Sequence, residues 1–178
     1  PACQREGVAV KICMIGAGYV GLVSAACFAD FGWDVTCVDK DEDRVARLKQ
    51  GEIPIYEPGL DELVARNVAA GRMHFLSSLR DGVQGADVVF LAVGTPQSEM
   101  DGAADLSYVL DAAHQVGHAL TDWAVIVTKS TVPVGTGDKV REAVRRGTKL
   151  EFSVASNPEF LKEGDAINDF MKPPRVII

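Results

Sequence analysis

Residues 10–44, VKICMIGAGYVGLVSAACFADFGWDVTCVDKDEDR, decide the fold. The apolar run VKICMI leads into GAGYVG, in which Gly16, Gly18 and Gly21 have the spacing G-x-G-x-x-G. A helical pattern over residues 19–31 follows, and then a second apolar run, DVTCVD. A strand, a glycine turn, a helix and a strand in this order predict a unit that binds a dinucleotide. The alternative, a glycine-rich turn without a ligand, does not explain why these features coincide.

Each glycine of the hexapeptide has its own physical role. Gly16 allows a tight turn, Gly18 presents no Cβ to a pyrophosphate, and Gly21 lets the helix pack closely on the strand. The helix that begins here presents free N–H groups and a partial positive charge, and both suit an anion.

The acidic residue Asp39 ends the second strand. A carboxylate in this position accepts hydrogen bonds from the adenosine ribose and repels a 2′-phosphate, which favours NAD over NADP. For Lys40 and Arg44 two interpretations stay open, because Arg44 lies in the first turn of a helix with a charged face. It either contacts the cofactor or is simply solvated.

The rest of the chain alternates between strand and helix patterns. Strands that read as continuous apolar runs are typical of a parallel sheet covered on both faces. We therefore expect an α/β fold, a doubly wound, Rossmann-type, mostly parallel sheet with helices on both faces. The further strands are expected at residues 73–78, 86–93, 123–130 and 149–156, and the further helices at 42–50, 58–71, 105–120 and 138–146.

The two ends of the chain differ from this pattern. Residues 1–9 read as a tail outside the domain, either processed or added, and residues 10–178 as the domain itself. The final RVII, residues 175–178, is expected to open one more strand, so the chain is expected to be cut from a longer protein.

Composition excludes several classes of protein. With 178 residues and 47% hydrophobic content, the chain can bury one sizeable core. The net charge of −7 leaves no basic stripe for nucleic acid, and no apolar run approaches the ~20 residues that cross a membrane. His114 and His118 lack a third ligand, so we expect no metal site and place them on a helix surface.

The four cysteines show no C-x-x-C spacing and mostly lie in apolar patterns, where a cysteine behaves as a small hydrophobic residue. This usage fits a reducing, cytoplasmic compartment. The four are Cys3, Cys13, Cys27 and Cys37.

From about Val10 to Ile178 the chain resembles the N-terminal, NAD-binding domain of the UDP-glucose/GDP-mannose dehydrogenase family. The motifs that carry the resemblance occur in order: IGAGYVGL, GEIPIYEPGLDEL, VGTP, ADLSYV, KSTVPVGT and NPEFLKEGDAINDF. The motif IYEPGL resembles the UDP-glucose branch of the family more than the GDP-mannose or UDP-N-acetylmannosamine branches.

The resemblance implies an NAD-dependent, two-step oxidation of the C6 alcohol of a UDP-sugar to a carboxylate through an aldehyde. In such enzymes a cysteine of the C-terminal domain captures the aldehyde, and the resulting thioester is hydrolysed. None of the four cysteines here matches that segment, so this chain alone is expected to be inactive, and the full-length protein is expected to be a homodimer.

The resemblance also assigns site residues. Cofactor contacts fall on Gly16, Ala17, Gly18, Tyr19, Val20, Gly21, Asp39, Arg44, Val93, Gly94, Thr95, Pro96, Gln97, Ser130, Thr131 and Glu163. The Thr131 hydroxyl holds a water or an oxyanion near the reacting carbon, and Glu159 is the acid/base of thioester hydrolysis. The substrate is bordered by Glu159, Phe160, Leu161, Lys162 and Glu163.

A purely structural interpretation of NPEFLKEG stays open beside the catalytic one. Asn157 as N-cap, Pro158 at the first helical position and Glu159 in the first turn form a sound helix start. Glu159 and Glu163 would then share one helical face. Lys162 is often Arg in this motif, and Lys keeps the charge but loses the forked geometry.

Three other classes of function stay open as well. A non-enzymatic NAD-binding module has no use for Thr131 and Glu159. A dehydrogenase of the β-hydroxyacid type needs a lysine-bearing helix further along and does not explain NPEFLKEG. A structural domain with a vestigial fold would bind no nicotinamide dinucleotide.

Overall fold

A computed structural model describes residues 10–96 and 104–178, so the expected tail at 1–9 lies outside the described residues. In this part of the chain, six strands form one sheet in the order β3-β2-β1-β4-β5-β6, and every neighbouring pair is parallel. The expected doubly wound α/β class is confirmed. The strands are β1 Lys11–Ile15, β2 Asp34–Val38, β3 Met73–Leu76, β4 Val88–Leu91, β5 Val125–Thr128 and β6 Ser153–Ser156.

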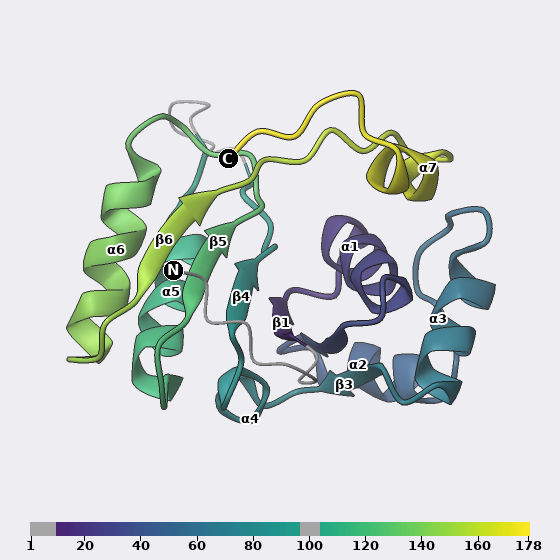
Figure 1. Cartoon of the computed structure of the whole chain (residues 1–178), viewed down its shortest axis with the longest axis horizontal. Helices are drawn as coiled ribbons and strands as arrows, with labels where there is room; N and C mark the ends of the chain where they lie inside the picture. The colour runs from purple at the N-terminus through teal and green to yellow at the C-terminus, as the bar shows by residue number, and fades with distance from the viewer. Residues whose placement is uncertain (1–9, 97–103) are drawn as a thin grey trace.

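Helices cover both faces of this sheet (Figure 1). The core on one face contains buried side chains of α1 (Tyr19–Asp30), α2 (Glu42–Lys49) and α3 (Leu60–Ala69). The core on the other face contains those of α4 (Leu79–Val83), α5 (Ser107–Ala119) and α6 (Thr136–Gly147). The short α4 was not expected, because five residues are too few for a visible helical period.

Helix α1 is nearly all apolar and lies against the centre of the sheet. Its residues Leu22 to Cys27 are fully buried, and three of these six side chains are Ala or Ser. At Gly21 an added Cβ would lie 1.8 Å from the carbonyl oxygen of Gly16, so only glycine allows this close approach. The expected packing role of Gly21 therefore agrees with the structure.

The cysteines in the described residues are free and fully buried: Cys13, Cys27 and Cys37. Burial raises the pKa of the Cys13 and Cys27 thiols to about 12, and raises that of Cys37 as well. These thiols therefore pack as small hydrophobic groups and stay protonated at neutral pH. Cys3 lies outside the described residues.

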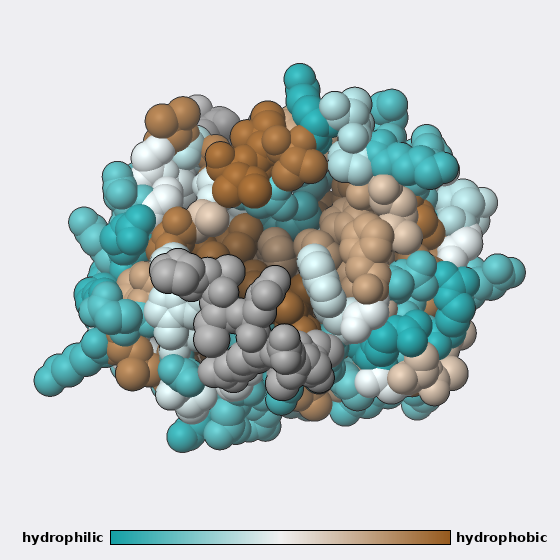
Figure 2. All heavy atoms as spheres, in the orientation of Figure 1, coloured by the Kyte–Doolittle hydropathy of each residue, from teal (hydrophilic) through white to brown (hydrophobic). Residues whose placement is uncertain are grey.

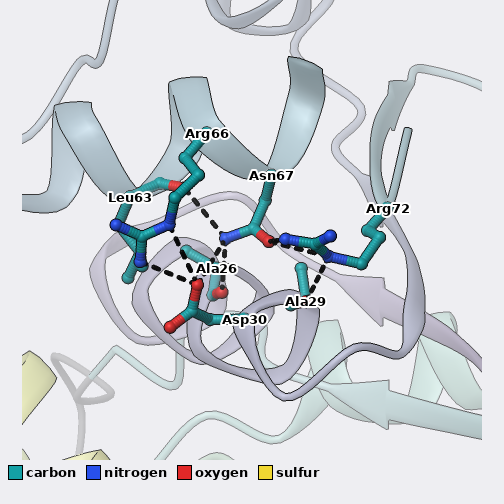
Figure 3. A network of polar contacts seen from close by, with 7 residues as sticks. All are labelled: Ala26, Ala29, Asp30, Leu63, Arg66, Asn67 and Arg72. Carbon is teal, nitrogen blue, oxygen red and sulfur yellow. Dashed lines mark hydrogen bonds and ion pairs between the residues drawn. The ribbon is translucent and has the colours of Figure 1, made fainter. Parts of the chain in front are cut away.

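Asn67 ties α3 to α1 from a fully buried position (Figure 3). Its Nδ2 donates to the carbonyl oxygen of Leu63 at 2.9 Å and lies 3.4 Å from Oδ1 of Asp30. Its Oδ1 accepts from Nη2 of Arg72 at 2.7 Å and from Nε at 3.1 Å. Arg66 completes the network with a 2.7 Å ion pair to Asp30.

The structure overturns the expected helix at NPEFLKEG. Residues 157–162 form neither helix nor strand, and α7 begins only at Ala166 (Ala166–Met171). Asn157 cannot serve as N-cap, because its Oδ1 accepts from Lys129 Nζ at 3.0 Å and its Nδ2 donates to the Ile177 carbonyl at 2.8 Å. Glu159 and Glu163 therefore do not share a helical face.

The expectation of a strand at the end of the chain is also wrong for this structure. Residues 175–178 are irregular, and the chain runs from α7 back over the carboxyl ends of β5 and β6 (Figure 1). The hydrogen bond from Asn157 to the Ile177 carbonyl holds the segment there.

Candidate functional site

The carboxyl ends of β1 and β4 lie side by side, and the connections that follow them turn toward opposite faces of the sheet. In open parallel sheets, ligands bind at such a point. Gly16 follows β1 with φ +105°, and an added Cβ would lie 2.5 Å from the Ala92 carbonyl oxygen. Its N–H donates to the Val38 carbonyl at 2.7 Å, which fixes the turn against β2.

Gly18 differs from its two neighbours in the motif. An added Cβ at Gly18 would meet nothing within 4 Å, so the fold itself does not require glycine there. Its missing side chain leaves an open cradle in front of the N-terminus of α1. This is the geometry expected if a pyrophosphate approaches the backbone at this position.

Asp39 follows β2 and is only 8% exposed. Its Oδ2 accepts from the Ala17 N–H at 2.8 Å and from Arg44 Nη1 at 2.9 Å, and its Oδ1 accepts from the Asp41 N–H at 3.0 Å. Burial by itself would raise the pKa of Asp39, but these three donors outweigh it and hold the pKa below its usual value. The carboxylate is therefore ionised at neutral pH. The sequence left open whether Arg44 contacts the cofactor or is solvated, and the structure adds a third role, an ion pair with Asp39.

These groups border a cavity of about 520 Å³ at the carboxyl edge of the sheet. It is large enough for part of a dinucleotide. Among the expected cofactor residues, those that line it are Gly16, Gly18, Asp39, Arg44, Val93, Gly94 and Pro96.

The wall that α5 contributes to this cavity was not predicted from the sequence. Tyr108, Asp111 and Gln115 line it, and Lys40 Nζ lies 5.2 Å from the centre of the Tyr108 ring. Their spacing on one helical face was visible, but nothing in the sequence showed that this face borders the cavity. Ser77 also lines the cavity, and its position just after a strand was a usable signal.

The loops after β4 and β5 are joined to each other. Ser130 Oγ donates to the Val93 carbonyl at 2.6 Å, and Thr95 Oγ1 donates to the Thr131 carbonyl at 3.3 Å. The expectation that Thr95 follows the strand next to β1 is confirmed by the β1–β4 pairing. Gln97 lies outside the described residues.

A second depression, of about 710 Å³, lies between the end of α1, the residues that follow β5 and β6, and the segment around α7. Figure 2 shows apolar side chains gathered around a hollow on this face. Of the expected substrate residues, four line it: Glu159, Phe160, Leu161 and Lys162. Glu159 accepts a 2.6 Å hydrogen bond from the Leu161 N–H, so its orientation is set by its own backbone turn.

Lys129 lies beneath this depression and was not predicted. It is 4% exposed, follows β5, and lines the depression next to Asn157. Burial lowers the pKa of its ammonium group, and the nearby Glu159 carboxylate opposes this shift. Its place directly before Ser130 and Thr131 in KSTVP was the signal that could have identified it.

The remaining expected residues line neither cavity. Thr131 and Glu163 are exposed, Thr95 and Ser130 lie in the loops after β4 and β5, and the rest lie in the turn or in α1 beside the cradle. Those not in either lining are Ala17, Tyr19, Val20, Gly21, Thr95, Ser130, Thr131 and Glu163.

The described residues contain neither a metal-binding cluster nor a helix that could span a membrane. Within 10–96 and 104–178, no three or more His, Cys, Asp or Glu side chains gather in a way that could hold a metal ion. His114 and His118 lie on α5, with 3.3 Å between their Nε2 atoms. In the same ranges, every helix is too short or too polar to cross a membrane.

The model of the UDP-glucose/GDP-mannose dehydrogenase family, NAD binding domain, matches residues 10–178. The chain belongs to this family. The glycine cradle and Asp39 therefore lie in an NAD-binding domain, and the residues present fit that cofactor. The sequence resemblance is confirmed.

Individual members of the family agree with this assignment. The chain is 59% identical to UDP-glucose 6-dehydrogenase of Rhizobium meliloti, over 95% of this chain and 39% of that protein. It is similar to the structure of a UDP-glucose dehydrogenase from Pyrobaculum islandicum, with a TM-score of 0.92 and 43% identity over 99% of this chain and 42% of that one. For the structure of a GDP-mannose dehydrogenase from Pseudomonas aeruginosa the TM-score is 0.84 and the identity 32%, over 95% of this chain and 40% of that one. The chain thus spans well under half the length of these relatives.

Proposed function

We propose that this chain is the NAD-binding domain of a UDP-glucose 6-dehydrogenase and that the complete protein oxidises UDP-glucose to UDP-glucuronate. The observation that carries the proposal is the pairing of the open cradle at Gly18 with the ionised Asp39 at the end of β2. The higher identity to UDP-glucose dehydrogenases than to the GDP-mannose enzyme supports the choice of sugar nucleotide. The homodimer and the cytoplasmic location expected from the sequence belong to the same proposal.

The first cavity is the proposed cofactor seat. The N–H groups at the start of α1 bind the pyrophosphate, and Asp39 accepts the ribose hydroxyls. The loops at Val93–Pro96 and Ser130–Thr131 close the seat on the side of β4 and β5, because hydrogen bonds join them. The bound NAD⁺ supplies the hydride acceptor.

The second depression is the proposed position of the sugar nucleotide. Phe160, Leu161 and Lys162 border it, and Glu159 moves the proton of the water that hydrolyses the thioester. The Thr131 hydroxyl orients that water. Glu163 is exposed and lines neither cavity here, so its proposed contact requires the ligand or another part of the protein.

The nucleophile is proposed to lie outside this chain. Cys13, Cys27 and Cys37 are buried, and their raised pKa values keep them protonated. The chain alone, mixed with NAD⁺ and UDP-glucose, should therefore bind NAD⁺ and release no NADH. Catalytic production of NADH by the isolated chain would contradict this part of the proposal.

The full-length protein provides the decisive experiment. With UDP-glucose it should form two molecules of NADH for each molecule of sugar nucleotide consumed. Its rate of NADH formation should be at least tenfold lower with GDP-mannose or UDP-N-acetylmannosamine. Glu159→Gln should abolish turnover and leave NAD⁺ affinity unchanged, whereas the exposed Glu151→Gln is the matched control. Full activity of the Glu159→Gln enzyme would favour a non-enzymatic use of this segment.

A further inference from the structure

Glu57 is a buried carboxylate whose role the proposed function does not use. It lies in IYEPGL, in the connection between α2 and α3, and is only 6% exposed. No Lys, Arg or His side chain of the described residues forms an ion pair with it. A buried charge without an ionic partner is costly unless hydrogen bonds replace its lost hydration, so the donors around Glu57 are informative.

The donors come from the two segments that carry the proposed chemistry. Oε2 accepts from the Tyr19 hydroxyl and, at 2.8 Å, from the Gly164 N–H. Oε1 accepts from the Ala166 N–H at 2.8 Å. Tyr19 directly follows the cradle glycine Gly18, whereas Gly164 directly follows the substrate segment 159–163 and Ala166 begins α7 two residues later. One side chain therefore bridges parts of the chain that are more than a hundred residues apart in sequence.

The bridge is charged at neutral pH. Burial alone would raise the pKa of Glu57, but the Tyr19 hydroxyl and the N–H groups of Gly164 and Ala166 hold it below its usual value. An ionised carboxylate only accepts hydrogen bonds, so all three donors can be satisfied at once.

The substrate segment has few other attachments. Residues 157–162 contain no helix or strand, and Asp165, the residue that caps α7, makes no side-chain capping bond. The side-chain hydrogen bonds between residues 157–162 and other described segments are those of Asn157 with Lys129 and with the Ile177 carbonyl, and that of the Lys162 N–H with Asp169 at 3.0 Å. The Asn157 N–H also donates to the Thr128 carbonyl at 2.9 Å, so most of these bonds lie at the two ends of the segment. The Tyr19 hydroxyl also lies 3.3 Å from the Lys162 carbonyl oxygen. Loss of Glu57 should therefore release this segment before it disturbs the sheet.

We propose that Glu57 is a positioning residue, whose carboxylate holds the substrate segment 159–163 in register with the cofactor loop through Tyr19, Gly164 and Ala166. The expected effect on kcat rests on the proposed function, whereas the expected effect on the structure of the segment does not. Glu57 sets where Glu159 stands relative to the cofactor seat without touching either ligand.

Glu57→Gln tests the bridge directly. The amide has almost the same shape but only one acceptor oxygen, so it can serve the Gly164 N–H or the Ala166 N–H and not both. In the 178-residue chain, hydrogen exchange at the amides of Gly164 and Ala166 should accelerate at least tenfold in the variant. The matched control is Glu52→Gln, which removes an exposed carboxylate paired with Arg47 and should leave these amides unchanged. Unchanged exchange in a folded Glu57→Gln chain would overturn the proposal.

Kinetics of the full-length protein separate positioning from a merely structural role. Glu57→Gln should lower kcat for UDP-glucose at least tenfold, while the Kd for NAD⁺ changes less than threefold. A parallel loss of NAD⁺ affinity and thermal stability with unchanged kcat would contradict positioning. If the wild-type enzyme does not oxidise UDP-glucose, the proposed function fails, and the exchange experiment still decides the role of Glu57.

A second variant serves if Glu57→Gln does not fold. Tyr19→Phe removes only the hydroxyl and keeps both N–H bonds of Glu57, so the chain should fold. It should accelerate exchange at the Lys162 to Gly164 amides by at least threefold, because the segment loses its link to α1. No change in that exchange would exclude the coupling to the cofactor loop.

Discussion

The backbone N–H of Ala17 donates a 2.8 Å hydrogen bond to Oδ2 of Asp39. This bond joins the glycine-rich turn after β1 to the end of β2, so the two parts of the proposed cofactor seat are held together without a ligand. Asp39 also binds Arg44, which balances its charge. Such an arrangement lowers the cost of ordering the site when the dinucleotide binds.

The glycines of the hexapeptide should respond differently to alanine. Gly18→Ala should leave the free energy of unfolding nearly unchanged and lower NAD⁺ affinity at least tenfold, because its Cβ would enter the cradle but touch no protein atom. Gly21→Ala should destabilise the chain by about 3 kcal/mol or more, because its Cβ would overlap the Gly16 carbonyl. Urea unfolding and calorimetry measure the two effects. Equal losses of stability would contradict the separation.

Asp39→Asn should change the choice of cofactor. The amide no longer repels a 2′-phosphate, and Arg44 loses its anionic partner and becomes available to one. We expect NAD⁺ affinity to fall about tenfold, because the hydrogen bonds to the ribose lose their charged acceptor, and the preference for NAD⁺ over NADP⁺ to shrink. Titration of both cofactors into the variant and into Asp43→Asn, a control on the exposed start of α2, checks this. An unchanged preference would exclude Asp39 as the selective group.

The same carboxylate should make stability depend on pH. The pKa of Asp39 is lowered in the folded chain, so its stabilising contribution is complete above the unfolded value of about 3.9. It is lost as the pH falls through the lower, folded value. The difference in Tm between wild type and Asp39→Asn should therefore be constant from about pH 5 to 7 and shrink below about pH 4. A difference that grew on acidification would contradict this sign.

Asn67 should contribute strongly to stability. Asn67→Ala removes the acceptor of Arg72 Nη2 and the side-chain donor to the Leu63 carbonyl, whereas Arg72 Nε keeps its 2.9 Å bond to the Ala29 carbonyl. We expect a cost of about 2 kcal/mol in the free energy of unfolding. The exposed Asn168→Ala should stay within about 0.5 kcal/mol of wild type. Urea denaturation of both variants measures the contrast, and equal effects would show that the network of Figure 3 adds little.

The sequence by itself determined the parts that depend on local chemistry. The apolar runs of β1 and β4, the helical pattern of α1 and the spacing of Gly16, Gly18 and Gly21 specify strands, a helix and a tight turn from neighbouring residues alone. The family motifs extended this to a cofactor class and to a set of site residues.

Tertiary structure alone decided the rest. The sequence predicted Asn157 as a helix cap, but its side chain accepts a hydrogen bond from Lys129 and donates one to the Ile177 carbonyl instead. The segment is therefore irregular, and α7 begins at Ala166. Likewise, the IYEPGL motif gave no sign that Glu57 would meet Gly164. Hydrogen bonds between residues far apart in sequence form only when the strand order brings these residues together. A polar side chain that could bind either of two partners binds the partner that burial and geometry favour.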